Sequence, residues 1–149
     1  MKIYTIGFTQ KSAEKFFSLL KNNNVKTVLD VRLNNVSQLA GFAKGRDLKY
    51  FLSELLNINY IHDLVFSPTK EILNDYKKKK ITWTEYEDKY KKLLEERNIM
   101  EIIKKRYNGE FNEFCLLCSE AQADKCHRRL AAEMIKETLI DENIEIIHL

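Results

Sequence analysis

The segment "LLCSEAQADKCHRR", Leu116 to Arg129, holds two of the chain's three cysteines, one of its three histidines and a pair of arginines. Thiols can act as nucleophiles or metal ligands, an imidazole as a base, and guanidinium groups as clamps for phosphate or carboxylate. These residue types point to three chemistries. They are a metal site, nucleophilic or acid–base catalysis, and an anion-binding pocket.

Zinc is the first chemistry that the spacing suggests, because Cys115, Cys118, Cys126 and His127 offer four ligand types that zinc accepts. Two leucines separate Cys115 from Cys118 in an apolar run typical of a strand, whereas a zinc knuckle needs a tight turn. Alternation along that strand sends the two thiols to opposite faces. The spacing therefore disfavours a four-ligand structural site, and we assign no metal ligands or cofactor. A three-ligand set of Cys118, Cys126 and His127 stays open.

Two other cysteine and glycine motifs are excluded by spacing. A phosphatase-type thiolate loop needs an arginine six residues after its cysteine, and Asp124 and Ala132 occupy that offset from Cys118 and Cys126. Gly7 ends a strand pattern but has no partner glycines, so a dinucleotide fingerprint is absent.

The elements that must position these side chains follow from apolar periodicity. Strands are predicted over residues 2–8, 25–32, 58–63, 113–120 and 144–149. Helices are predicted after the caps or openers Ser12, Asp47, Pro68, Thr82 with Glu85, and Asp124. The Asp47 helix would bury Leu48, Phe51, Leu52, Leu55 and Leu56, the Pro68 helix would reach Lys80, and the Asp124 helix about Thr138. This order predicts one α/β domain over residues 1–149, Rossmann-like and three-layered, with about five mainly parallel strands and a helical insertion before the fourth.

Polar residues recur where those strands end. They are Gly7, Asp30 with Arg32, His62 with Asp63, and Cys118 with Glu120. Ligands of open α/β sheets bind outside the carboxyl ends of the strands, so a scattered set in sequence becomes one rim in space. We expect Gly7, Arg32, Cys118 and Arg128 to bind the ligand and Asp30, Glu120 and His127 to move protons.

The last helix adds to this rim. With Asp124 as its cap, His127 would face the sheet, Arg128 would lie on the flank and Arg129 would point to solvent. Its free amides and positive dipole end favour an anion and would lower the pKa of Cys126, the candidate reactive thiol.

Composition sets limits on the partner and the compartment. A formal charge of +3 and 32% charged residues describe a mildly basic globular chain, which permits an anionic partner without requiring one. Three cysteines without a signal peptide or an apolar span indicate reduced thiols in a soluble cytoplasmic protein with no membrane partner. The run Lys77–Lys80 is read as a solvated helix end, and Trp83, Tyr86 and Tyr90 as core.

The leading hypothesis is a pocket for an anionic ligand, such as a nucleotide, a phosphorylated metabolite or a nucleic-acid end, with catalysis on that ligand left open. One alternative is a nucleic-acid-binding or processing module that also uses the lysine-rich insertion. The other is a structural or interaction domain in which Asp30, Arg32, Glu120 and Arg128 form ion pairs that lock strand ends to a helix.

The segments "YTIGF", "VLDVR", Gly41–Phe42, "LLCSE" and "CHRRLAAEMI" together resemble the prokaryotic domain-of-unknown-function 488 family. The paired Cys-Xaa-Glu and Cys-His-Arg is the most specific mark. The resemblance implies the same rim residues and adds Phe42, but no reaction. Two positions depart from the family pattern: Phe8 stands where a histidine is usual, and Gln38 follows Ser37 where the family has Ser-Arg.

Overall fold

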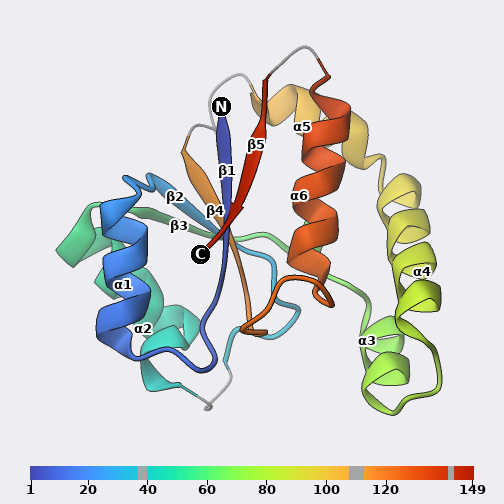
Figure 1. The fold of residues 1–149 in the computed structure, drawn as a ribbon, viewed down its shortest axis with the longest axis horizontal. Coiled ribbons are helices and arrows are strands. Elements are labelled where there is room, and N and C mark those ends of the chain that lie inside the picture. The colour runs from blue at the N-terminus through green and yellow to red at the C-terminus, as the bar shows by residue number, and fades with distance from the viewer. Residues whose placement is uncertain (37–39, 108–112, 141–142) are drawn as a thin grey trace.

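The computed structural model describes residues 1–36, 40–107, 113–140 and 143–149. At its centre lies a parallel sheet of β1 (Lys2–Gly7), β2 (Thr27–Asp30), β3 (Asn59–His62), β4 (Phe114–Cys118) and β5 (Glu145–His148) (Figure 1). The strands lie in the order β3-β2-β4-β1-β5. The predicted α/β class is thus confirmed, and the sheet is parallel throughout.

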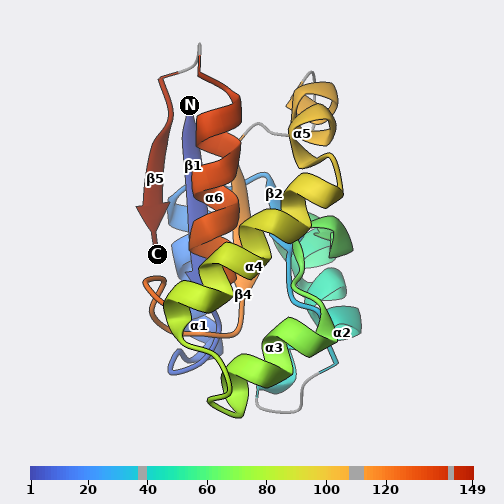
Figure 2. The same cartoon turned by 90° about the vertical axis from the view of Figure 1, so that its right-hand side faces the viewer.

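Helices cover both faces of this sheet. On one face lie α1 (Ala13–Asn22) and α2 (Gly45–Tyr50), and on the other α4 (Trp83–Glu96), α5 (Ile99–Tyr107) and α6 (His127–Thr138) (Figures 1 and 2). Together with α3 (Lys70–Lys77), α4 and α5 form the predicted helical insertion between β3 and β4. The arrangement is consistent with a Rossmann-like three-layer fold.

Strand alternation divides the buried residues into two cores. Leu116 and Cys118 of β4 pack against Tyr90 and Leu130 on the α4–α6 face, whereas Cys115 packs with the α1–α2 core. The prediction that Cys115 and Cys118 point to opposite faces is confirmed. Cys115 is therefore separated from the other two thiols by the sheet itself.

Three predicted helix starts were wrong, and the caps explain why. Asp47 lies in the first turn of α2, which begins after Lys44. The side chain of Thr69, not Pro68, caps α3 by accepting a hydrogen bond from the backbone N–H of Ile72. Cys126 rather than Asp124 is the N-cap of α6, so His127 is its first residue.

Two other predicted helix starts are confirmed. Ser12 caps α1, and Thr82 and Glu85 form the expected capping box of α4. Beyond α2 the chain continues as a π-helical turn over Phe51–Leu55. Because a π-turn holds more residues than an α-turn, the expected apolar stripe rotates away, and Leu55 is 66% exposed.

The strand order decides which strand ends meet. β4 lies between β2 and β1, with Asp30 in register with Leu117 and Gly7 with Cys118. The polar residues that follow these three strands therefore share one edge of the sheet. No helix in the described ranges is both long and apolar enough to cross a bilayer.

Candidate functional site

A pocket of about 740 Å³ opens at this edge of the sheet. Its inner wall is formed by Thr9 after β1, Arg32 after β2, Cys118 to Glu120 at the end of β4, and Lys125 to His127 at the start of α6. The helical insertion closes the opposite side with Tyr76, Lys77, Lys79, Trp83 and Tyr86. This is the position in which open α/β sheets bind ligands.

The predicted site residues divide into two groups around this pocket. Arg32, Cys118, Glu120, Cys126 and His127 line it, as the sequence predicts for the rim. Gly7, Asp30 and Arg128 are not among the lining residues, and each contacts a group that is. The predicted ligand-binding and catalytic roles stay predictions; the geometry shows what each side chain touches.

Arg32 lines the pocket, and its buried guanidinium group contacts Asp30, Ala43 and Phe8. Its Nε and Nη2 donate to the two carboxylate oxygens of Asp30 at 2.8 and 2.6 Å, and Nη2 also donates to the Ala43 carbonyl. The ring of Phe8 lies 5.1 Å from its Cζ. Nη1 is buried and has no hydrogen-bond partner within the described part of the chain. The two N–H bonds of one terminal nitrogen of a fixed arginine are thus left unsatisfied.

Asp30 is fully buried and positions Arg32. It also accepts a 2.6 Å hydrogen bond from the Tyr60 hydroxyl, which in turn accepts one from Asn35. Burial, followed by the charge of Asp30, raises the pKa of Tyr60, so this hydroxyl stays a donor. The sequence analysis missed Tyr60, because nothing in a strand pattern shows that a side chain in register with Val28 reaches the end of β2.

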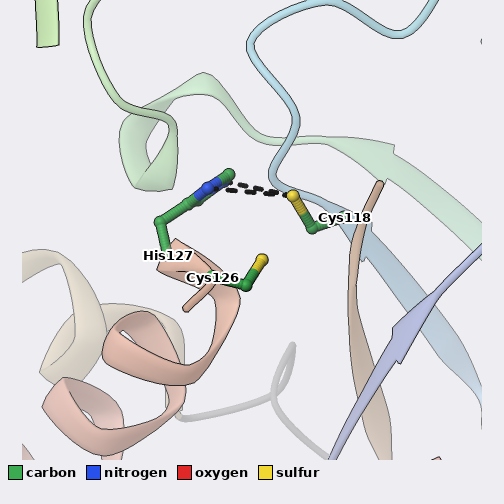
Figure 3. Close-up of side chains that lie close together, drawn as sticks. All are labelled: Cys118, Cys126 and His127. Carbon is green, nitrogen blue, oxygen red and sulfur yellow. Dashed lines mark hydrogen bonds between the residues drawn. The ribbon is translucent and has the colours of Figure 1, made fainter. Parts of the chain in front are cut away.

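Cys118, Cys126 and His127 form a buried cluster on the pocket wall (Figure 3). One ligand atom from each residue lies within 4.8 Å of the others. The Cys118 sulfur is 3.7 Å from Nδ1 of His127, whose Nε2 lies 2.8 Å from the Val31 carbonyl. The three side chains come from two elements, the end of β4 and the start of α6.

The two thiols of this cluster differ in acidity, and in the sense opposite to the one predicted. A hydrogen bond from the Cys126 thiol lowers the pKa of Cys118, helped by the Ser119 backbone N–H and the charge of Arg128. The same bond, followed by burial, raises the pKa of Cys126. The predicted low pKa of Cys126 was therefore wrong.

Selective alkylation tests this assignment. In reduced, chelator-treated protein, Cys118 is expected to react with iodoacetamide with a pH midpoint below 9, the value of an unperturbed thiol. Cys126→Ala removes the donor and should move that midpoint upward. Peptide mass spectrometry across a pH series measures both, with buried Cys115 as the unreactive internal control. Labelling of Cys126 before Cys118 would contradict the assignment.

Arg128 lies behind the pocket, where it holds the loop that follows β4. It is 1% exposed and donates to the carbonyl oxygens of Glu120 and Ala121, with Thr5 at 3.4 Å from its Nε. In the described ranges no carboxylate pairs with it, so the expected Glu120–Arg128 contact uses the Glu120 backbone carbonyl and not the side chain. Of the ion pairs foreseen for a structural lock, Asp30–Arg32 is present.

The remaining rim positions have structural contacts. A ring nitrogen of His62 lies 2.8 Å from the Arg32 carbonyl, and Asp63 pairs with Arg106. Phe42 packs against Phe16 in the α1–α2 core. Ser37 and Gln38 lie outside the described residues.

The sequence analysis also missed the cations on the outer wall. Lys77 and Lys79 were read as a solvated helix end, and Lys125 was not considered, yet all three line the pocket. The lysine run is visible in the sequence, but whether it lines a pocket depends on how α3 and α4 pack over the sheet. Tyr86 is buried as predicted, whereas Trp83 is only half-buried and faces the pocket.

The fold and the pocket together define a class: a parallel α/β protein with a polar crevice at the carboxyl ends of its strands. Within that class, the chain belongs to the family described as domain of unknown function DUF488, whose sequence model matches residues 12–135. The matched range contains Arg32 and the Cys-Xaa-Glu and Cys-His-Arg motifs, and begins after Gly7 and Phe8. No curated protein and no solved structure shows significant similarity to the chain.

Proposed function

We propose that the protein binds an anionic ligand of the nucleotide type, a phosphate group joined to a flat ring system, in the pocket at the strand ends. The observation that carries this proposal is the charge of the lining. Among the described lining residues are three lysines, Lys77, Lys79 and Lys125, besides the Asp30-paired Arg32, and one acidic residue, Glu120. Such an excess within one concave site attracts phosphate and raises its local concentration.

The buried guanidinium supports a phosphate as the bound group. A buried donor without a partner costs about 1–3 kcal/mol, and a phosphate oxygen would relieve that cost at Nη1 of Arg32 once a shift of the pocket wall exposes this nitrogen. Because Asp30 already neutralises this arginine, Arg32 supplies a fixed N–H direction. The three lysines supply the net charge.

The aromatic wall supports a ring system on the same ligand. Tyr76, Trp83 and Tyr86 line the side opposite the strand ends; Trp83 stacks on the buried Tyr86, so the half-buried rings of Trp83 and Tyr76 are the ones proposed to stack on a base. Glu120 and His127 in the same pocket are the groups proposed to move protons if the ligand is converted. We place this function in a prokaryotic cytoplasm, where the three free cysteines would stay reduced.

Fluorescence of Trp83 tests the proposal, because this is the chain's one tryptophan and it lines the pocket. Nucleoside mono-, di- and triphosphates are expected to change its emission saturably, and nucleosides without phosphate to bind more weakly. Lys77→Ala combined with Lys79→Ala should weaken binding about tenfold or more, since charged hydrogen bonds to phosphate are lost.

A charge-matched control separates pocket contacts from general attraction. Lys91 and Lys92 are exposed on α4 and do not line the pocket, so their double alanine variant should bind like the wild type. Equal weakening by both double variants would mean that net charge alone drives the signal. Absence of any saturable signal with phosphorylated and unphosphorylated ligands would overturn the proposal.

A second candidate is binding of a single-stranded nucleic-acid end, favoured by the fact that all of Lys77 to Lys80 are exposed beside the pocket. This candidate requires an affinity for short DNA or RNA that falls steeply with salt, because bound phosphates release counterions. Salt-independent or absent binding of oligonucleotides would leave the mononucleotide proposal alone.

A further inference from the structure

We propose that Cys118, Cys126 and His127 bind one thiophilic divalent metal ion, with zinc as the ion that fits best, and leave its fourth coordination position open to the pocket. The inference concerns the free protein and does not depend on the nucleotide-type ligand proposed above. It rests on the spacing, orientation, burial and charge balance of the three side chains.

The spacing of the ligand atoms matches a tetrahedral site. Zinc–sulfur bonds of about 2.3 Å and zinc–nitrogen bonds of about 2.0–2.1 Å place two sulfurs about 3.8 Å apart and a sulfur and a nitrogen about 3.6 Å apart. The Cys118 sulfur and Nδ1 of His127 are 3.7 Å apart, and all three ligand atoms lie within 4.8 Å of one another.

The backbone already directs these atoms to a common point. Figure 3 shows the sulfur of Cys118 at the end of β4 facing both the imidazole of His127 and the sulfur of Cys126 at the start of α6. Strand alternation turns Cys118 toward α6, and the extended N-cap conformation of Cys126 turns its side chain back toward the sheet. Two rigid elements therefore hold the set, as a metal site requires.

A hydrogen bond to the backbone sets which nitrogen of His127 carries the hydrogen. A carbonyl oxygen can only accept, so the 2.8 Å contact with Val31 places a hydrogen on Nε2 of His127. In the neutral ring the lone pair then resides on Nδ1, which lies 3.7 Å from the Cys118 sulfur, with Nε2 at 3.8 Å, so a rotation of the ring must aim that lone pair at the shared ion. Histidine ligands of metals usually donate their other N–H to a carbonyl or carboxylate in this way.

Charge balance favours a divalent ion in this buried place. All three residues are buried, and a charge left uncompensated there would be costly. Two thiolates and a neutral imidazole around one divalent cation form a complex of zero net charge. Binding converts two thiols to thiolates, so two protons leave for solvent with each ion bound.

The fourth coordination position of the ion would be open to the pocket. Three protein ligands with a free fourth site are the arrangement of catalytic zinc, whereas structural zinc has four. All three residues line the pocket, as does Glu120. A ligand or water on the ion would therefore meet the same cavity.

Metal titration of the reduced, chelator-treated chain tests this inference without any activity assay. Zn²⁺ is expected to bind one ion per chain with release of two protons, measured by calorimetry in buffers of different ionisation enthalpy. Co²⁺ should give the thiolate charge-transfer and visible absorption of a tetrahedral site. Cys118→Ser, Cys126→Ser and His127→Gln should each weaken binding by about 100-fold or more.

Cys115→Ser is the matched control, because Cys115 is buried on the opposite face of the sheet and should leave binding unchanged. Circular dichroism establishes that each variant is folded. A second measurement uses the wild type alone: bound Zn²⁺ should protect Cys118 and Cys126 from alkylation, and its removal should restore their labelling.

Three results would overturn the inference. They are no stoichiometric uptake by folded reduced protein, loss of uptake in Cys115→Ser with retention in Cys118→Ser, and unchanged labelling of Cys118 and Cys126 with zinc. A Cys118–Cys126 disulfide in protein that takes up no metal after reduction would assign the pair to redox chemistry instead.

Discussion

Gly7→Ala is expected to lower the free energy of unfolding by roughly 3 kcal/mol or more, the upper end for an overpacked site. A Cβ built at Gly7 would lie 1.7 Å from the carbonyl oxygen of Glu120 and 2.6 Å from its carbonyl carbon. Both atoms belong to the backbone, so no side-chain rotation relieves the contact. Either β1 or the loop after β4 must move.

Gly7 and the loop after β4 come close because this loop carries residues of the pocket wall past the end of β1. Gly7 is in register with Cys118, and the chain beyond Cys118 crosses in front of β1 before it enters α6. The hydrogen bond from the Phe8 backbone N–H to the Cys118 carbonyl holds the two segments together at 3.3 Å. Displacing this loop would also move Glu120 and the thiol cluster.

Urea unfolding of Gly7→Ala and Gly41→Ala measures the effect and its control. Alanine at Gly41 meets no atom within 4 Å, so that variant should stay within about 0.5 kcal/mol of the wild type. Equal stabilities for the two variants would show that the loop after β4 adapts freely and that the close approach does not constrain it.

Arg128→Ala is expected to cost roughly 3–5 kcal/mol, because two carbonyl oxygens lose their donors at about 1–3 kcal/mol each and a large buried side chain is removed. The substitution removes the donors of the Glu120 and Ala121 carbonyls and leaves a cavity under α6. Arg128→Met keeps most of the apolar stem and should recover part of the loss, because only the hydrogen bonds then disappear.

The neighbouring arginine is the control for this prediction. Arg129 is partly exposed and pairs with Glu133 at 2.7 Å and Glu87 at 3.3 Å, so Arg129→Ala should cost about 1 kcal/mol or less. Thermal and urea unfolding measure the free energy of unfolding of the three variants. A fully stable Arg128→Ala protein would mean that the loop does not need this clamp and would return Arg128 to the ligand-binding role predicted for it.

Much of the fold follows from local patterns, and the confirmed elements show why. Apolar runs placed all five strands, and alternation within "FCLLC" separated Cys115 from Cys118. The caps at Ser12 and Thr82 were readable because a cap is a contact between residues three positions apart. The start of α6 was mispredicted because it lies at His127, after a loop whose path depends on Arg128 and Gly7; the Thr69 cap of α3 was a local signal that was overlooked.

The sequence by itself determined which chemical groups gather at the strand ends, because the carboxyl ends of parallel strands must share one edge of the sheet. Tertiary structure alone decided what each group does there. It turned Asp30 toward Tyr60, gave Arg128 to the loop carbonyls, and placed Lys77 and Lys79 across the pocket from the sheet. The physical reason is range: periodicity and capping act over a few residues, whereas these contacts join residues dozens of positions apart or depend on the path of a loop.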